Sequence, residues 1–254
     1  MLMDEKQKAS VTLLFLSPMI AELLSGSAPP VEFFNPIGLL FLVLLYGCGA
    51  VLIRETVKRW RKGAPSLLLL GGAYGIWEEG VVVKSFFDPN WVDLGILGTY
   101  GRRIGVNWVW VLHLTIYHVV MSITVPIILV ETMYEHVRDT TWLGKRGITL
   151  LSILFLIDSL LINLLITRFQ PSIWQYAFCF LLIVILIWLA RKVPRSIMLG
   201  KHELPSYRKL WFIGFLWISS FFFSILGITV HHTLSDNYMP HRNTPCVYLY
   251  LLLI

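Results

Sequence analysis

Residues 36–86 decide the fold, and they read PIGLLFLVLLYGCGAVLIRETVKRWRKGAPSLLLLGGAYGIWEEGVVVKSF. Two apolar runs, 36–57 and 65–86, are separated by a connection that contains the basic segment RWRK at 59–62. An α-helix needs about 20 mostly apolar residues to cross about 30 Å of hydrocarbon. Both runs meet that requirement, so this stretch predicts two membrane-spanning helices joined by a basic loop.

The same alternation of apolar runs and short polar connections fills the rest of the chain. Hydrophobic residues make up 56% of the 254 residues and charged residues 14%, whereas soluble domains carry about 25% charged residues. We predict further full spans at 10–26, 104–130, 147–167, 173–190 and 210–231. An eighth apolar run, 244–254, is too short to cross and is expected to be an incomplete span. The sequence thus predicts an all-α, polytopic helix bundle of seven full spans, forming one integral membrane domain over residues 1–254.

The distribution of lysine and arginine sets the expected orientation. With the N-terminus in the cytoplasm, the inner side receives Lys6, Lys8, Arg54, Lys58, Arg59, Arg61, Lys62, Arg138, Lys145, Arg146, Arg191, Lys192, Arg195, Lys201, Arg208 and Lys209. The outer side then receives Lys84, Arg102, Arg103, Arg168 and Arg242. Basic residues collect in cytoplasmic loops. We therefore expect the protein to lie in the cell membrane with its N-terminus and its basic loops on the cytoplasmic side. The net charge of +6 comes from these loops, and the partner that it implies is the lipid bilayer, not a nucleic acid.

Ionisable side chains inside the apolar runs indicate a functional site, because each costs roughly 2.5–3.5 kcal/mol at membrane depth. Glu78 and Glu79 lie in the predicted third span, and His113 and His118 lie in the fourth. Counting about 1.5 Å per residue puts Glu78 and His113 at overlapping depths in the outer half of the membrane, with His118 near the middle of its span. We therefore predict that the carboxylates meet an imidazole of the neighbouring helix, and these four residues are the candidate catalytic residues. His113 and His118 lie about 140° apart around the helix, so one face cannot present both.

Gly71 and Gly75 share the helix face of Glu78 in the predicted third span. Small residues at this spacing let another helix approach closely. The glycines therefore predict that this face, with its carboxylates, turns into the bundle. In the predicted fifth span, Asp158 and Asn163 are expected to form a buried hydrogen-bonded pair, with a proton relay as the alternative.

Four further residues are candidates for binding a substrate. Glu22 lies in the first span, Asn107 lies in the fourth, and Arg102 and Arg103 lie just before the fourth. The two arginines suit phosphate, either as anchors to lipid headgroups or as ligands of an anionic substrate group. The outer loop 84–103 is apolar and aromatic, so we expect it to lie at the interface or to fold over the outer opening as a lid.

His231 and His232 end the predicted seventh span and are candidate metal ligands, with an interfacial polar cap as the alternative. A divalent metal is therefore the cofactor that these residues suggest, and the sequence does not identify which metal.

Two adjacent glutamates on one helix, followed by a histidine on the next, resemble the CPBP intramembrane proteases. That family carries Glu-Glu-x-x-x-Arg, then Phe-x-x-x-His, then His-x-x-x-Asn or Asp. In this chain the basic residue is displaced to Lys84, no Phe precedes His113 or His118 by four residues, and no His occurs between 136 and 202. The resemblance implies that Glu78 or Glu79 activates water, while His113 or His118 holds or polarises it.

Three functions fit these residues. The first is a hydrolase that uses an outward-facing Glu/His site on a lipid-linked or peptide substrate. The second is a proton- or metal-coupled transporter that uses the same residues as a binding site. The third is a non-catalytic scaffold or assembly factor, in which the polar groups only fix the packing of the helices.

Overall fold

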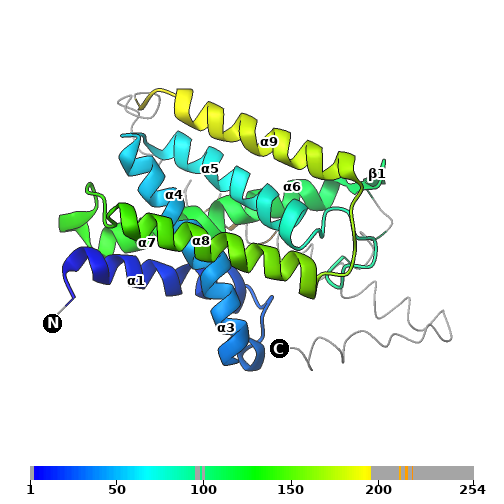
Figure 1. Ribbon diagram of the computed structural model, residues 1–254, viewed down its shortest axis with the longest axis horizontal. Coiled ribbons are helices and arrows are strands. Elements are labelled where there is room, and N and C mark those ends of the chain that lie inside the picture. The colour runs from blue at the N-terminus through cyan, green and yellow to red at the C-terminus, as the bar shows by residue number, and fades with distance from the viewer. Residues whose placement is uncertain are drawn as a thin grey trace.

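The computed structural model describes residues 3–94, 98 and 101–195, together with 212, 215, 216 and 219. Figure 1 shows a bundle of helices, with α9 lying beside α5 and with α1 and α3 on the opposite side. The predicted seventh span lies almost wholly outside the described residues. The predicted incomplete span 244–254 and the candidate ligands His231 and His232 lie entirely outside them.

Several helices continue into a short π-helical segment, written η, without a break. The elements are α1 (Glu5–Pro18), η1 (Met19–Leu23), α2 (Pro30–Phe33), α3 (Pro36–Leu42), η2 (Val43–Gly47), α4 (Cys48–Arg59), α5 (Ala64–Ile76), η3 (Trp77–Val82), β1 (Arg102–Arg103), β2 (Val106–Asn107), α6 (Trp108–Tyr117), η5 (His118–Thr124), α7 (Val125–Met133), the 3₁₀ turn η6 (Glu135–Val137), α8 (Lys145–Leu161), η7 (Ile162–Ile166) and α9 (Ile173–Lys192).

Four continuous helices among the described residues are long and apolar enough to cross a membrane. They are Pro36–Arg59, Trp108–Met133, Lys145–Ile166 and Ile173–Lys192. These helices correspond to the predicted second, fourth, fifth and sixth spans. The predicted first and third spans are helical as α1–η1 and α5–η3, but their charged residues make them less apolar. The count of seven spans therefore stays a prediction.

The helix of the predicted fourth span begins at Trp108, not at residue 104, because a short hairpin precedes it. Strand β1 pairs antiparallel with β2, and Arg102 lies opposite Asn107. Gly105 in the turn has a φ of +70°, a conformation that glycine adopts at little cost. The fold therefore contains one small strand pair, which the all-α prediction did not include.

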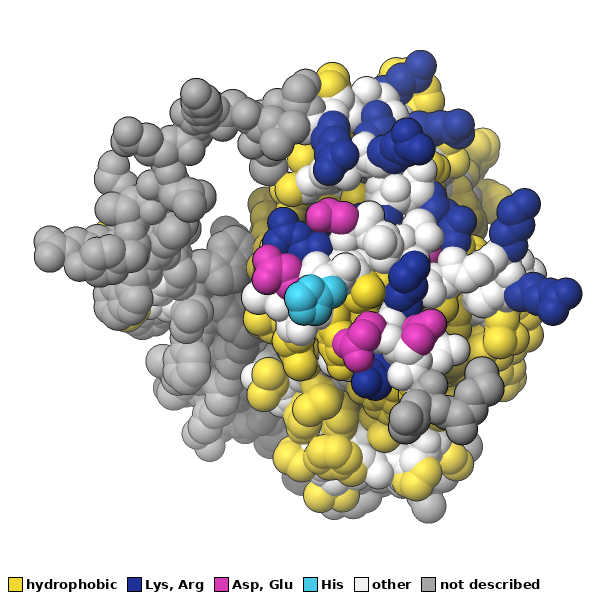
Figure 2. Space-filling model, turned by 90° about the vertical axis from the view of Figure 1, so that its left-hand side faces the viewer, with side chains coloured by type: hydrophobic (Ala, Val, Ile, Leu, Met, Phe, Trp, Pro, Cys, Tyr) yellow, Lys and Arg dark blue, Asp and Glu magenta, His cyan; other side chains and the backbone are white. Residues whose placement is uncertain are grey.

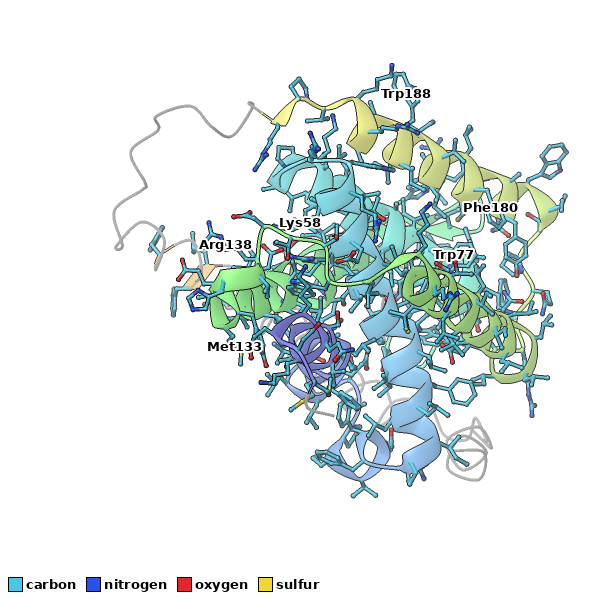
Figure 3. The ribbon with its side chains drawn as sticks, turned by 60° about the vertical axis from the view of Figure 1, so that its left-hand side comes forward. Lys58, Trp77, Met133, Arg138, Phe180 and Trp188 are labelled. Carbon is cyan, nitrogen blue, oxygen red and sulfur yellow. The ribbon has the colours of Figure 1, made fainter. Side chains whose placement is uncertain are left out.

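Helix α5 lies at the centre of the bundle and packs against α4, α6, α9 and η5. Trp77, at the end of α5, fills the space towards α8 and α9 (Figure 3). Its indole nitrogen donates to the Ser159 hydroxyl at 3.1 Å, and its ring lies 6.1 Å from the ring of Phe180. Phe180 and Trp188 lie along α9 and are themselves partly exposed, as a lipid-facing helix requires.

Glycines allow α5 to approach the α6–η5 helix closely. A Cβ atom on Gly75 would lie 3.1 Å from the Cβ of His118 and 3.3 Å from the Cα of Thr115. A Cβ atom on Gly71 would lie 3.2 Å from the Cα of Val119. This glycine face therefore sets how near His118 comes to the carboxylates of the next turn.

We expect Gly75→Ala to destabilise the protein by about 1–3 kcal/mol, because the added methyl group forces two packed helices apart. Thermal unfolding of the purified protein in detergent measures the effect. Gly72→Ala is the matched control, since its Cβ would lie 3.7 Å from the nearest atom, the Leu186 Cδ1, which is an ordinary contact. Equal destabilisation by both variants would contradict the role given to Gly75.

One end of the bundle is strongly basic. The beginnings of α1 and α8 and the ends of α4, α7 and α9 lie together at this end (Figure 1). Figure 2 looks onto it and shows lysine and arginine side chains spread over the surface among a few acidic ones. The described parts of the connections that the sequence assigns to the inner side thus lie at one end of the molecule.

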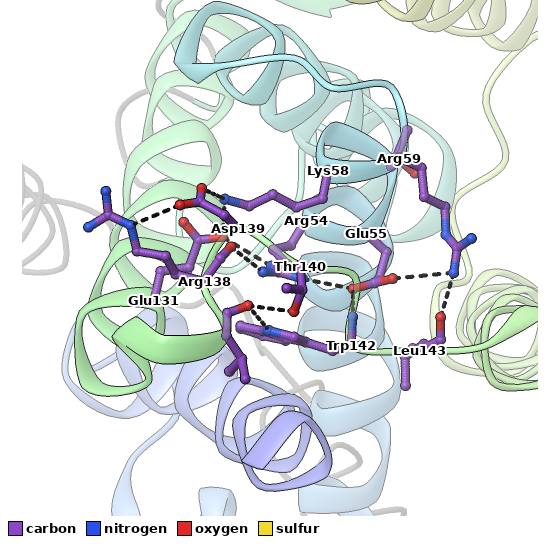
Figure 4. Close-up of polar contacts among 12 residues, drawn as sticks. Arg54, Glu55, Lys58, Arg59, Glu131, Arg138, Asp139, Thr140, Trp142 and Leu143 are labelled. Carbon is purple, nitrogen blue, oxygen red and sulfur yellow. Dashed lines mark hydrogen bonds and ion pairs between the residues drawn. The ribbon is translucent and has the colours of Figure 1, made fainter. Parts of the chain in front are cut away.

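A buried ion-pair network ties the helices together near this basic end (Figure 4). The Arg54 guanidinium donates to Glu55 at 2.9 Å, to Glu131 at 3.0 Å and to the carbonyl of Arg138 at 2.6 Å. It also lies 3.5 Å from the centre of the Trp142 ring. Arg54 and Glu55 are both 1% exposed. The network therefore connects α4 to α7 and to the chain that follows α7.

Candidate functional site

The structure brings Glu78, Glu79 and His118 into direct contact. Glu78 and Glu79 lie on η3, and His118 begins η5. Nε2 of His118 lies 2.8 Å from Oε1 of Glu79, and Nδ1 lies 3.3 Å from Oε2 of Glu78. The side chains of Glu78 and His118 are 2% exposed, while that of Glu79 is 9% exposed. An imidazole is thus held between two carboxylates, and Glu79 is the one closer to the surroundings.

Hydroxyl and indole groups complete the hydrogen bonds of this cluster. Nδ1 of His118 lies 2.9 Å from the hydroxyl of Ser122. The hydroxyl of Ser85 donates to Glu79 and accepts from the indole nitrogen of Trp110 at 3.0 Å. The orientation of Glu79 is therefore set by two groups from outside its own helix, His118 and Ser85.

Three buried tyrosines enclose the imidazole of His118. The rings of Tyr46, Tyr74 and Tyr117 lie 6.1, 6.0 and 5.5 Å from its ring, respectively. Tyr46 also donates its hydroxyl to the carboxylate of Glu22 on η1. Glu22 is therefore linked to the cluster through Tyr46, which packs on His118 but contacts a different carboxylate.

Some buried polar atoms of this cluster have no hydrogen-bond partner within the described residues. They are Oε2 of Glu78, the hydroxyl of Tyr74 and the hydroxyl of Thr115. Oε2 of Glu78 lies 3.3 Å from Nδ1 of His118, an approach that lacks hydrogen-bond geometry. Most buried polar groups in proteins are paired, so such atoms call for a further partner. A bound water or substrate group would supply it.

Six polar side chains of the cluster lie on π-helical segments. Glu22 is on η1, Tyr46 on η2, Glu78 and Glu79 on η3, and His118 and Ser122 on η5. A π turn is wider than an α turn and rotates successive side chains through a smaller angle, which lets adjacent Glu78 and Glu79 face one neighbour. Such turns occur frequently at functional sites. No feature of the sequence had indicated these π-helical segments.

The same three residues could hold a divalent metal. Each of Glu78, Glu79 and His118 offers one ligand atom, and these atoms lie within 4.8 Å of one another. Two ligands of a tetrahedral zinc ion are about 3.4 Å apart when the bonds are about 2.1 Å long. The 2.8 Å contact between His118 and Glu79 is a hydrogen-bond distance and would have to lengthen to admit zinc. The geometry therefore favours proton exchange between imidazole and carboxylate.

His113 does not join this cluster. Its ring stacks on that of Trp110 at 6.1 Å, and the side chain is half-buried on a different face of the helix from His118. The two histidines are thus separated by rotation around the helix, as their spacing predicts.

The candidate substrate ligands near the hairpin make local contacts. Asn107 caps α6, its side-chain oxygen accepting from the backbone of Trp110 at 3.1 Å. The Arg102 guanidinium donates to the carbonyls of Phe87, Asp88, Gly98 and Gly105 at 2.7 to 3.3 Å. Arg103 is exposed, and its carbonyl accepts from the indole of Trp108. Arg102 therefore holds the loop 84–103 against the hairpin.

The predicted pair of Asp158 and Asn163 is wrong. The Asn163 amide donates to the carbonyl of Val81 at 2.6 Å and to the hydroxyl of Tyr176 at 3.3 Å. Neither carboxylate oxygen of Asp158 makes a hydrogen bond within the described residues. Residues five apart point to different sides of an α-helix, which is why the two side chains cannot meet.

Lys84 has a role that the sequence did not reveal. Its side chain is fully buried, and its ammonium donates to the carbonyls of Asn163 and Thr167 at 2.7 and 3.0 Å. These carbonyls lie at the end of the α8–η7 helix, where a cation is favourable. Lys84 therefore ties the turn before Ser85 to that helix end. The sequence feature that could have indicated this role is the position of Lys84, a charged residue at the start of an apolar loop.

Comparison with known proteins gives a family but no function. A family model described as "Uncharacterized membrane protein family" matches residues 11–223. No curated protein and no solved structure matches the chain.

Proposed function

The chain belongs to this uncharacterized membrane protein family, and we propose that it is a membrane-embedded hydrolase whose acid–base centre is Glu78, Glu79 and His118. The observation that carries the proposal is the imidazole of His118 held between two buried carboxylates of the neighbouring helix. Imidazole and carboxyl groups in hydrogen-bond contact are the side chains that most often carry out general acid–base catalysis. The partial resemblance to CPBP proteases supports the same reaction class.

The proposed reaction uses water as the nucleophile. The unpartnered oxygen of Glu78 accepts a proton from water as the water oxygen adds to the electrophilic carbon or phosphorus of the substrate. The leaving group takes a proton from His118, whose charge Glu79 balances at 2.8 Å. A divalent metal at the same three residues is the alternative means of activating water.

The substrate that we propose is a lipid-linked group or a membrane peptide, because the centre lies on helices of the bundle among apolar side chains. Glu79 is the most exposed member of the centre, and Ser85 beside it is the second residue of the loop 84–103. We propose that this loop covers the centre as a lid on the outer side of the cell membrane. Arg102 and Arg103 then lie where an anionic head group of the substrate would arrive.

The test compares membranes from cells that produce the wild type, Glu78→Gln, Glu79→Gln or His118→Gln. We expect the same lipid-linked or peptide species to accumulate with all three variants, because Glu78 and His118 transfer protons and Glu79 balances the charge of His118. Mass spectrometry of lipids and membrane peptides measures this. Glu135→Gln, at an exposed position, is the matched control.

Two results would change the proposal. If the amounts of lipid-linked and peptide species do not differ between the wild type and the variants, the hydrolase proposal is wrong. Solute uptake that the three variants abolish would support a transporter in its place. Metal analysis of the purified protein decides between proton transfer alone and metal assistance, since stoichiometric metal that is lost in Glu79→Gln supports the latter.

A further inference from the structure

Another buried carboxylate, that of Asp158, lies outside the cluster just described. Asp158 is on α8 and is 1% exposed. Neither of its carboxylate oxygens has a hydrogen-bond partner within the described residues. A carboxyl group at membrane depth is costly unless it is neutral or paired. Asp158 therefore requires a partner, and the described residues of the chain do not supply one.

Asp158 lines a small crevice between two helices. The crevice has a volume of about 90 Å³. Its other walls are apolar, formed by Leu40, Phe41 and Leu44 on the α3–η2 helix and by Leu154, Ile157 and Leu161 on α8. Asp158 is the one ionisable side chain among these lining residues.

The crevice opens sideways, towards the hydrocarbon. Leu40 and Ile157 at its rim are 56% and 51% exposed, and both belong to helices long and apolar enough to cross a membrane. Asp158 lies eight residues from Ile166, about 12 Å along the helix. The opening is thus within reach of lipid chains, away from both ends of the continuous α8–η7 helix.

The size and the charge of the crevice define what fits it. A cavity of about 150 Å³ holds benzene, and one water occupies about 30 Å³ in the liquid. The crevice can therefore hold a small head group with a few methylene groups, while a longer tail lies along the exposed leucines. A group that donates to both carboxylate oxygens and balances the charge is an ammonium.

We propose that the Asp158 crevice binds the amino head of a long-chain primary amine that enters from the hydrocarbon. The neutral carboxyl gives its proton to the amine, and an ammonium carboxylate pair forms with no other bond broken. This site uses none of the residues of the proposed hydrolase, so its test is independent of that function.

Dicyclohexylcarbodiimide tests the proposal on the full-length protein in phosphatidylcholine nanodiscs. This apolar reagent reacts with protonated carboxyl groups. The carboxyl oxygen bonds to the carbodiimide carbon, the proton moves to a nitrogen, and the acyl group then migrates to nitrogen, so nothing leaves. We expect peptide mass spectrometry to find the adduct on Asp158 in the wild type, and no adduct in that peptide in Asp158→Asn.

Dodecylamine is the probe ligand. At ten times its dissociation constant it should slow labelling of Asp158 roughly tenfold, because it occupies the site and removes the carboxyl proton. Dodecanol at the same concentration should protect far less, since it cannot carry the balancing charge. Leu44→Phe, which fills the crevice and leaves Asp158 in place, should abolish the protection by dodecylamine.

Three results would overturn the proposal. They are failure to label Asp158 in the folded wild type, equal protection by dodecanol and dodecylamine, and full amine protection in a folded Leu44→Phe variant. The comparison of the two probes needs no variant, so it stands even where Leu44→Phe does not fold.

Discussion

Replacing Glu79 by glutamine is expected to lower the turnover of the hydrolysed substrate by up to roughly 10²–10⁴-fold, the usual contribution of general acid catalysis, because His118 loses the carboxylate that balances its charge. Glutamine keeps the volume of the side chain and an oxygen that can accept from Ser85. It removes the negative charge that faces Nε2 of His118 at 2.8 Å. The loss should therefore fall on the chemical step, which single-turnover rates in detergent or nanodiscs measure.

A graded partner variant distinguishes chemistry from folding. Ser122→Ala removes the hydroxyl that lies 2.9 Å from Nδ1 of His118 but leaves all three proposed catalytic groups. We expect a smaller loss of turnover than in Glu79→Gln, together with an unchanged unfolding temperature in both variants. A fully active Glu79→Gln protein would refute the assignment of this carboxylate.

Replacing Arg54 by methionine should give the largest loss of stability, about 3–5 kcal/mol, because it leaves a buried charge without its partner. Glu55 is 1% exposed and accepts from Arg54 at 2.9 Å and from the backbone of Trp142 at 2.7 Å. Methionine fills much of the space but cannot donate to Glu55 or Glu131. Denaturant or thermal unfolding in detergent measures the change.

Two further variants make this prediction specific. The double variant Arg54→Met with Glu55→Gln should recover part of the loss, since it removes the unpaired charge and keeps an acceptor for Trp142. Lys8→Met removes the exposed pair that Lys8 forms with Glu5 at 2.9 Å, and should have no measurable effect. A single Arg54→Met variant as stable as the wild type would contradict the structural role of the network.

The local hydropathy pattern was enough to predict the helices and the approximate residues at which they begin and end. The prediction of a multi-span membrane protein is confirmed by four apolar helices and by the family of the chain. Hydropathy over about 20 residues depends only on neighbours in sequence, so it can be read without coordinates. The limits were wrong where a local signal was absent, as at residues 102–107, where a hairpin replaces the first turn of the expected helix.

Contacts between distant residues were harder to predict. The spacing of Glu78 and Glu79 indicated where carboxylates enter the bundle, but the choice of His118 over His113 depends on how the two helices are rotated. That rotation follows from the π segments η3 and η5 and from the close approach at Gly75. Neither the π segments nor the close approach at Gly75 can be derived from the 3.6-residue period of an α-helix.

The sequence by itself determined that this is an apolar helical chain with basic connections and with carboxylates in its third hydrophobic run. Only the tertiary structure decided that His118 lies between those carboxylates, that Arg54 is buried in a network and that Asp158 is without a described partner. The physical reason is that partition into lipid is a property of each segment, whereas pairing of polar groups depends on the phase and distance of helices far apart in the chain.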